Sequence, residues 1–213
     1  MYEIKTIHSK NDILSCNKFE INHFNWSADY KPYSYGYVGL LENKGLLVRL
    51  CCEEENPLCT YTEPNSMVYK DSAMEAFFQI NPELNKGYIN LELNSAGVLR
   101  AQFGETRDER TFFTEEQMKQ CEIRCDKETL PTSHKSHTQN MWWVEILLPF
   151  SIIDYFYGDG SAEELKNGST LRCNFFKLSE SPEIEHYASY SPIDYPTPNF
   201  HMPEFFADAV VRE

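Results

Sequence analysis

Hydrophobic and polar residues alternate along three consecutive segments in the middle of the chain. Residues 73–80 read AMEAFFQI, residues 88–94 read YINLELN, and residues 98–104 read VLRAQFG. A repeat of two is the period of a β-strand, because successive side chains of an extended chain point to opposite faces. Residues typical of turns (Asn, Pro, Gly and Ser) separate the three segments. The pattern therefore predicts an antiparallel meander of three strands.

Short apolar or alternating runs predict further strands elsewhere in the chain. These runs are 45–52, 142–150, 170–178 and 206–211. Two short helices are predicted at 114–120, where a Thr precedes two Glu, and at 151–157. Many short strands with few helices are typical of a β-sandwich or a barrel. No boundary interrupts the pattern, so the sequence predicts one all-β domain over residues 1–213, with its helices in loops.

Charge and composition exclude some classes of partner. The net charge is -14, whereas binding to nucleic acid or to an anionic membrane requires a basic surface. The first residues, MYEIKTIHSKNDIL, lack the apolar run of a secretory signal. No stretch approaches the ~20 apolar residues that span a bilayer. We therefore expect no nucleic-acid or membrane partner, and a cytoplasmic protein if Met1 is the native start; a trimmed N-terminus would leave secretion open.

The seven cysteines do not form a recognisable framework. Their number is odd and their spacing is irregular, which favours reduced thiols that pack as small apolar residues. Cys121 and Cys125, followed by His134 and His137, raise the question of zinc. Their C-x3-C and H-x2-H spacings do not match the usual zinc patterns. The sequence therefore favours a solvated loop with incidental histidines.

Polar side chains gather on the outward face of the predicted meander. They are Glu75, Asn90, Glu92, Asn94, Arg100 and Gln102. Such a face is either a hydrated sheet surface or a site whose carboxylate, amide and guanidinium groups bind vicinal hydroxyls. An enzyme would use Glu75 together with Glu92 or Asp71 as a carboxylate pair. The residues alone leave these alternatives open.

The segment 191–206, SPIDYPTPNFHMPEFF, combines four prolines with four aromatic rings. Proline restricts the backbone, so we expect a stiff, extended coil that covers one end of a sheet. His201 lies between Phe200 and Met202. A single histidine in such surroundings is typically a hydrogen-bonded structural residue, and we expect that role here.

Several separated blocks resemble one known family. The blocks are 68–104, 142–150 (WWVEILLPF), 172–178 (RCNFFKL) and 186–211. In this order they resemble the family 9 carbohydrate-binding modules, and most closely the stand-alone family 9-like (DOMON-like) proteins. The resemblance implies a β-sandwich of two antiparallel sheets. It also implies a role in polysaccharide metabolism by non-catalytic binding of mono- or oligosaccharide ends.

The resemblance also implies ligand-binding residues. Carried over position by position, Glu75, Arg100 and Asn174 would hydrogen-bond to sugar hydroxyls. The family holds its sugar between two tryptophans, and here Tyr69 and Tyr190 are the aromatic residues nearest to those positions. The adjacent Trp142 and Trp143 are expected in the core.

Structural calcium is common in that family, and loop acids that could bind it are Asp71, Asp108 and Asp126. The sequence leaves two alternatives to sugar binding open. One is a glycoside hydrolase or lyase that uses a carboxylate pair. The other is a sandwich that has lost its sugar site and serves as an interaction protein.

Overall fold

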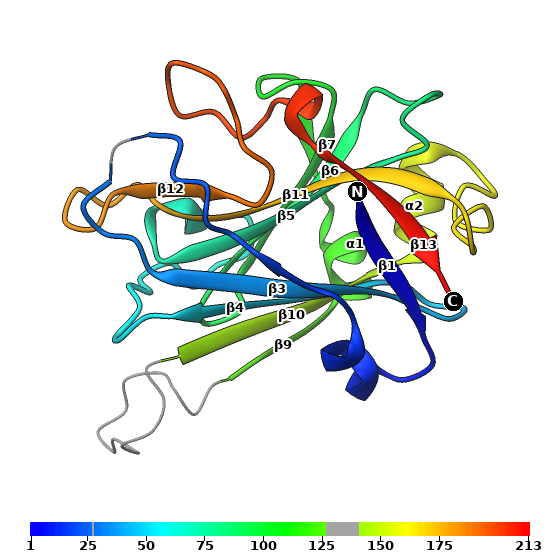
Figure 1. Cartoon of the computed structure of the whole chain (residues 1–213), viewed down its shortest axis with the longest axis horizontal. Coiled ribbons are helices and arrows are strands. Elements are labelled where there is room, and N and C mark those ends of the chain that lie inside the picture. Colours follow the sequence, from blue (N-terminus) through cyan, green and yellow to red (C-terminus); the bar gives the residue numbers. More distant parts are fainter. Residues whose placement is uncertain (27, 127–140) are drawn as a thin grey trace.

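The computed structural model describes residues 1–26, 28–126 and 141–213 (Figure 1). Its strands are β1 (Tyr2–Ile7), β2 (Lys18–Glu20), β3 (Tyr33–Leu41), β4 (Gly45–Glu53), β5 (Ala73–Ile80), β6 (Tyr88–Asn94), β7 (Leu99–Gly104), β8 (Arg110–Phe112), β9 (Glu122–Cys125), β10 (Met141–Pro149), β11 (Thr170–Ser179), β12 (His186–Ser189) and β13 (Ala207–Arg212). The helices are α1 (Glu115–Gln120) and α2 (Phe150–Tyr157), with the 3-10 turns η1 (Lys10–Ser15), η2 (Val68–Lys70) and η4 (Pro203–Phe205). None of the helices in these ranges is long and apolar enough to span a membrane.

The strands confirm the all-β prediction but not the division into two separate sheets. The described strands follow one hydrogen-bonded path, β8-β7-β6-β5-β11-β13-β1-β3-β4-β10-β9, with β2 beside β3 and β12 beside β11. The continuity depends on β1, which pairs in parallel with both β13 and β3. The sequence patterns did not include β1 among the predicted strands, and without it the two halves would be two sheets.

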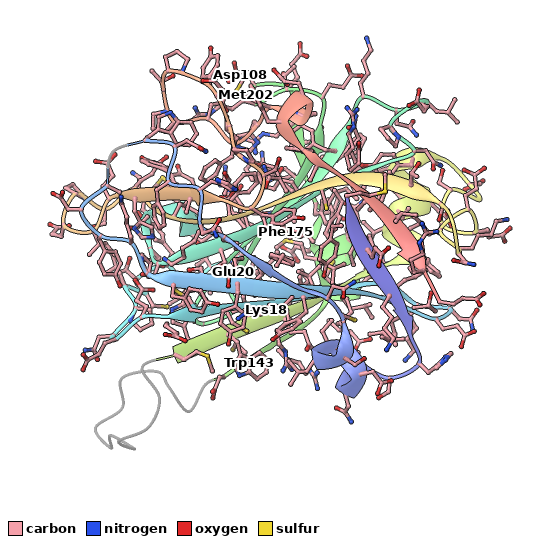
Figure 2. The ribbon with its side chains drawn as sticks, viewed as in Figure 1. Lys18, Glu20, Asp108, Trp143, Phe175 and Met202 are labelled. Carbon is pink, nitrogen blue, oxygen red and sulfur yellow. The ribbon has the colours of Figure 1, made fainter. Side chains whose placement is uncertain are left out.

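The sheet curls so that its two halves face each other across one core. One half contributes residues such as Phe78 and Leu91, and the other contributes Val48 and Trp142, all of them buried. Phe175 of β11 lies near the middle of this core (Figure 2). Burial of these large apolar side chains, at roughly 25 cal/mol per Å² of apolar surface, is the main stabilising term.

Trp142 and Trp143, expected together in the core, lie on opposite faces of β10. Trp142 is buried, and its Nε1 donates a hydrogen bond to the carboxylate of Glu54 at 3.0 Å. Trp143 faces outward, is only half-buried, and packs under the guanidinium of Arg49 at 4.3 Å. The expectation is therefore wrong for Trp143, because adjacent residues of a strand must point to opposite faces.

The predicted meander is confirmed as β5, β6 and β7, which pair in antiparallel order. Glu75 lies opposite Glu92, and Glu92 lies opposite Arg100. The helix predicted at 114–120 is α1, whose N-cap Thr114 accepts a hydrogen bond from the backbone of Gln117. These local features follow from sequence patterns because they depend on neighbouring residues only.

Both faces of β5 are buried, although alternation predicted one polar outer face. All eight residues of β5 are buried. The segment that follows β12 covers the outer face, where Phe200 stacks on Phe176 with ring centroids 4.1 Å apart. Phe77 and Tyr88 join the same second apolar cluster. The segment 191–206 thus covers a sheet face, whereas its composition predicted cover of a sheet end, and it encloses the polar residues of that face.

Asp71 anchors the loop that precedes β5. Its buried carboxylate accepts hydrogen bonds from Thr60 N and Oγ1 (both 2.8 Å), from Tyr61 N (3.0 Å) and from Asn94 Nδ2 (2.9 Å). Four donors occupy its acceptor positions. A buried carboxylate with this number of donors needs no further ligand.

We predict that Asp71→Asn lowers the free energy of unfolding by about 2–3 kcal/mol, because the amide replaces an acceptor oxygen by a donor that faces other donors. Urea denaturation measures the change. Asp108→Asn, at an exposed position, is the matched control and should change stability by less than about 0.5 kcal/mol. Equal stability of the two variants would contradict the anchoring role.

Candidate functional site

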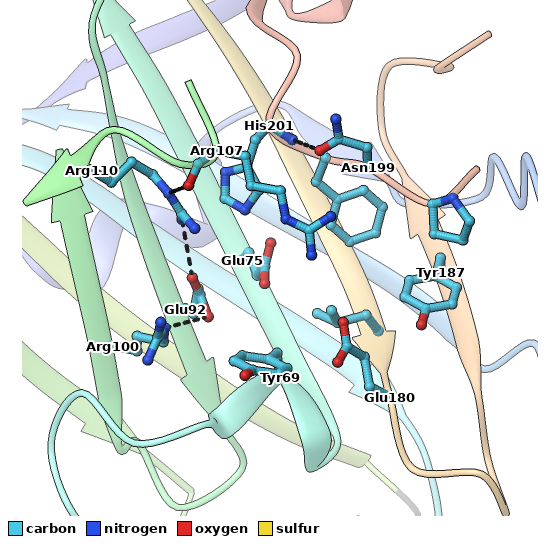
Figure 3. Close-up of a pocket in the computed structure, with 13 residues that line it drawn as sticks. Tyr69, Glu75, Glu92, Arg100, Arg107, Arg110, Glu180, Tyr187, Asn199 and His201 are labelled. Atoms are coloured by element: carbon cyan, nitrogen blue, oxygen red, sulfur yellow. Dashed lines mark hydrogen bonds and ion pairs between the residues drawn. The ribbon is translucent and has the colours of Figure 1, made fainter. Parts of the chain in front are cut away.

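A cavity of about 170 Å³ opens on the covered face of the sheet (Figure 3). Its floor is formed by β5, β6 and β7, and its walls by the loop before β8, by β12 and by the segment 198–201. The lining residues are Tyr69, Glu75, Glu92, Arg100, Arg107, Arg110, Leu178, Glu180, Tyr187, Pro198, Asn199, Phe200 and His201. Three carboxyl groups, three guanidinium groups and three aromatic rings therefore meet in one small space.

Arg100 is held in a fixed orientation on the floor. Its Nη1 donates a hydrogen bond to the backbone oxygen of Asn65 at 2.9 Å. Its guanidinium lies over the rings of Tyr69 and Phe112, at 5.5 and 4.7 Å. Its Nε is 3.5 Å from Oε2 of Glu92. Contacts on every side make this group a preorganised donor.

Glu92 is buried between two arginines. Asn90 Nδ2 donates a hydrogen bond to its Oε1 at 2.8 Å, and Arg110 Nη1 lies 3.9 Å from the same oxygen. Burial raises the pKa of Glu92 to about 7, although Arg100 and Arg110 act in the opposite direction. Glu92 therefore changes its charge near neutral pH.

Glu75 lies beside Glu92 without a cation of its own. Its side chain is almost completely buried, at 3% exposed, and no described residue donates a hydrogen bond to its Oε2. Burial, followed by the negative charge of Glu92, raises the pKa of Glu75 well above its ordinary value. A buried polar atom without a partner is costly. Such an atom at a cavity is a position where a ligand hydroxyl or a water completes the hydrogen bonding.

The upper wall of the cavity carries positive charge and a neutral histidine. His201 Nδ1 lies 2.9 Å from the hydroxyl of Tyr88, which confirms the hydrogen-bonded role expected for this histidine. Burial and the neighbouring arginines hold the pKa of His201 well below its ordinary value. Arg110 Nε donates to the backbone oxygen of Arg107 at 2.8 Å, which ties the loop before β8 to the pocket.

Aromatic rings line separate edges of the cavity. Tyr69 lies near Arg100, and Tyr187 lies on the opposite wall formed by β12 (Figure 3). Trp26 packs against Tyr187 in a T-shaped contact at 6.2 Å, and Phe200 packs at 6.1 Å. Polar groups between aromatic edges give the cavity a mixed character, with apolar faces for packing and fixed donors and acceptors for orientation.

A family model for carbohydrate-binding family 9 matches residues 8–210. The chain belongs to carbohydrate-binding family 9. Comparison with curated protein sequences gives no match.

Solved structures agree with this fold at low sequence identity. A candidate carbohydrate-binding protein from Bacteroides uniformis matches with a TM-score of 0.78 and 19% identity, covering 99% of this chain and 98% of its own. A family 9 module from Caldicellulosiruptor kristjanssonii in complex with cellotriose has a TM-score of 0.63 and 10% identity, covering 99% and 93%. The glucose complex of a family 9 module from the same organism has a TM-score of 0.61 and 12% identity, covering 99% and 95%.

In this family 9 protein, three of the five predicted ligand residues line the cavity: Tyr69, Glu75 and Arg100. Asn174 does not. It is fully buried, its Oδ1 accepts hydrogen bonds from the backbone of Ser191 (2.8 Å) and Phe175 (2.9 Å), and its Nδ2 donates to Ser191 O (3.1 Å). The structure therefore gives Asn174 a role in anchoring the start of the covering segment.

Tyr190 is also placed away from the cavity. It packs against Phe19 at 5.5 Å and Tyr2 at 6.1 Å in the main core. The ring on the cavity wall is Tyr187, which sequence reasoning did not select. Tyr187 is paired with Leu178 of β11, so it shares the face of Glu75. The pairing of β12 with β11 could have identified it, since residues opposite each other share one face.

The structure of the family 9 protein describes only some of the proposed metal ligands. No group of three or more His, Cys, Asp or Glu suited to a metal occurs among residues 1–26, 28–126 and 141–213. His134 and His137 lie outside these ranges. Asp71 is a poor calcium ligand because four donors already occupy its carboxylate. For the same reason it is not available as the acidic partner of Glu75.

The raised pKa values predict how stability depends on pH. The folded state binds protons at Glu75 and Glu92 more tightly than the unfolded chain does, so unfolding releases protons between their ordinary and raised pKa values. The contribution of this pair to stability therefore falls as the pH rises from 4.5 to about 7 and above.

We predict that Glu75→Gln, which cannot ionise, loses less stability than the wild type over this range, because the pKa of Glu75 is raised in the folded state. Denaturant unfolding between pH 4.5 and 8 measures it. Glu83→Gln, at an exposed position, should follow the wild-type curve. A Glu75→Gln curve parallel to the wild type would show that Glu75 ionises normally.

Proposed function

We propose that this protein binds carbohydrate in the cavity, at the end of a mono- or oligosaccharide, without catalysing a reaction. The observation that carries the proposal is the buried Oε2 of Glu75, which lacks a hydrogen-bond partner at a cavity edged by Tyr69 and Tyr187. Membership of carbohydrate-binding family 9 supports it. The solved family 9 modules with cellotriose and glucose support the ligand class.

Each part of the cavity would serve a different part of a sugar ring. Glu75 would accept hydrogen bonds from ligand hydroxyls, and Arg100 would donate to a ring or hydroxyl oxygen. Tyr69 and Tyr187 would pack against the C–H faces of the ring, where apolar surface is removed from water. Because Arg100 is already fixed by its own contacts, binding would cost little ordering of that side chain.

The walls favour a chain end over the middle of a chain. The loop before β8 and the segment 198–201 rise beside the floor. A cavity of about 170 Å³ with walls of this kind accommodates one terminal residue better than a through-going polymer. We therefore expect soluble monosaccharides and short oligosaccharides to compete for the same site.

We predict that Tyr187→Ala weakens binding of glucose or cellotriose about tenfold, because the wall loses its aromatic surface. Isothermal titration calorimetry measures the dissociation constant. Tyr195→Ala is the control, since Tyr195 is exposed and lies outside the cavity. Its affinity should equal that of the wild type. If both variants bind as the wild type does, the ligand does not contact Tyr187.

A glycoside hydrolase is the second candidate function. Glu75 and Glu92 lie directly opposite on neighbouring strands, and both carboxyl groups have raised pKa values. Paired carboxyl groups, one of them held protonated, are the machinery of glycoside hydrolysis. Two arginines restrain Glu92, however, which favours binding over acid–base chemistry.

Incubation with a panel of oligosaccharides and aryl glycosides separates the two functions. The binding proposal predicts no product above the buffer control. Product formation that is abolished by Glu75→Gln would establish the hydrolase instead. A protein that neither binds nor cleaves any member of the panel would favour a sandwich that acts as an interaction protein.

A further inference from the structure

Arg107 differs from the other six arginines of the chain. All seven arginines belong to the described residues. The other six make ion pairs with Asp or Glu: Arg49, Arg100, Arg110, Arg124, Arg172 and Arg212. The guanidinium of Arg107 makes no ion pair or hydrogen bond with any described residue, although it lines the cavity. A cation that is placed at a binding cavity without a partner is available to a ligand.

The backbone of Arg107 is nevertheless held in place. Its carbonyl oxygen accepts the 2.8 Å hydrogen bond from Arg110 Nε, and Arg110 Nη1 donates to Asn90 Oδ1 at 3.3 Å. Arg110 thus connects the exposed loop to the buried floor. Figure 3 shows the side chain of Arg107 directed over the cavity, above Glu75. The backbone of Arg107 is therefore held in place, while its guanidinium has no partner within residues 1–26, 28–126 and 141–213.

The cavity is a local exception to the charge of the whole protein, whose net charge is -14. Glu92 forms ion pairs with both Arg100 and Arg110. These three side chains together therefore carry a net positive charge. Burial raises the pKa of Glu75 and so disfavours its charged form. Glu180 is the opposing carboxyl group on the far wall. Arg107 adds a further positive charge at the mouth.

We propose that Arg107 makes this cavity selective for a sugar that carries a carboxylate, a uronic acid, over the neutral sugar of the same configuration. The inference rests on the proposed carbohydrate binding and adds the ligand class. The planar guanidinium presents paired N–H donors that match the two oxygens of a carboxylate. The hydroxyls of the same ring would remain available to Glu75 and to Arg100.

The experiment uses matched pairs of sugars and the full chain. Calorimetry at pH 7 compares glucose with glucuronate, galactose with galacturonate, and mannose with mannuronate. For the sugars that bind, we expect the wild type to favour the acidic form over the neutral form about tenfold. A charge-assisted hydrogen bond between guanidinium and carboxylate in a partly enclosed site accounts for a preference of this size. Arg107→Gln should reduce that preference to within about twofold. Arg212→Gln, at the end of β13, is the control and should retain the preference.

The outcomes separate this inference from the proposed function. If neutral sugars bind and the acidic partners bind equally or less well, the inference is wrong and the proposed function stands. An Arg107→Gln variant that weakens neutral and acidic sugars alike would also overturn it. A glucose sulfate that binds tightly while every uronate binds weakly would replace the carboxylate by a sulfate ester. If no sugar of either kind binds, the proposed function fails and the inference fails with it.

Discussion

The candidate site depends on the packing of segment 191–206 across the outer face of β5, β6 and β11. Asn174 fixes the start of this segment through paired hydrogen bonds with Ser191. Farther along, Phe200 stacks on Phe176, and His201 reaches the hydroxyl of Tyr88. Without this cover, Glu75 would lie on a hydrated sheet surface, where a carboxylate is fully solvated and has an ordinary pKa.

Burial changes the chemistry of the polar residues below that segment. Glu75 and Glu92 face each other in a space that disfavours negative charge, so their pKa values rise. The arginines are divided by role. Arg100 and Arg110 hold Glu92 and the walls in place, whereas the guanidinium of Arg107 has no ion-pair or hydrogen-bond partner among the described residues. Glu75 offers an acceptor without a donor, and Arg107 offers a cation without a carboxylate, among the described residues. Both groups complement a polar, partly anionic ligand.

The sequence predicted the features that depend on neighbouring residues. Strand period identified β5, β6 and β7, and it placed Glu75, Glu92 and Arg100 on one face, as the registers confirm. The sequence predicted that segment 191–206 covers a sheet end, but not that this segment lies over the face of Glu75, because the two are more than a hundred positions apart in the chain. It also could not reveal that β1 joins the two halves into one sheet.

Two of the predicted ligand residues lie outside the cavity for the same reason. Asn174 lies on the same strand face as Glu75, but its side-chain amide already forms hydrogen bonds with the backbone of Ser191. Tyr190 was chosen by its nearness in the chain to the expected aromatic position, but the wall ring is Tyr187. The choice between these tyrosines depends on how β12 pairs with β11, which is a tertiary property. A resemblance to a family transfers a fold more securely than a ligand contact, since sites vary on a conserved frame.

A crystal structure of the full chain, soaked with a sugar that binds in calorimetry, tests the proposed site most directly. We expect a sugar ring in the cavity between Tyr69 and Tyr187, with a ring hydroxyl within hydrogen-bond distance of Glu75 Oε2. A sugar bound instead on the outer face of β3 and β10, against Tyr35 or Trp143, with the cavity filled only by water, would contradict it.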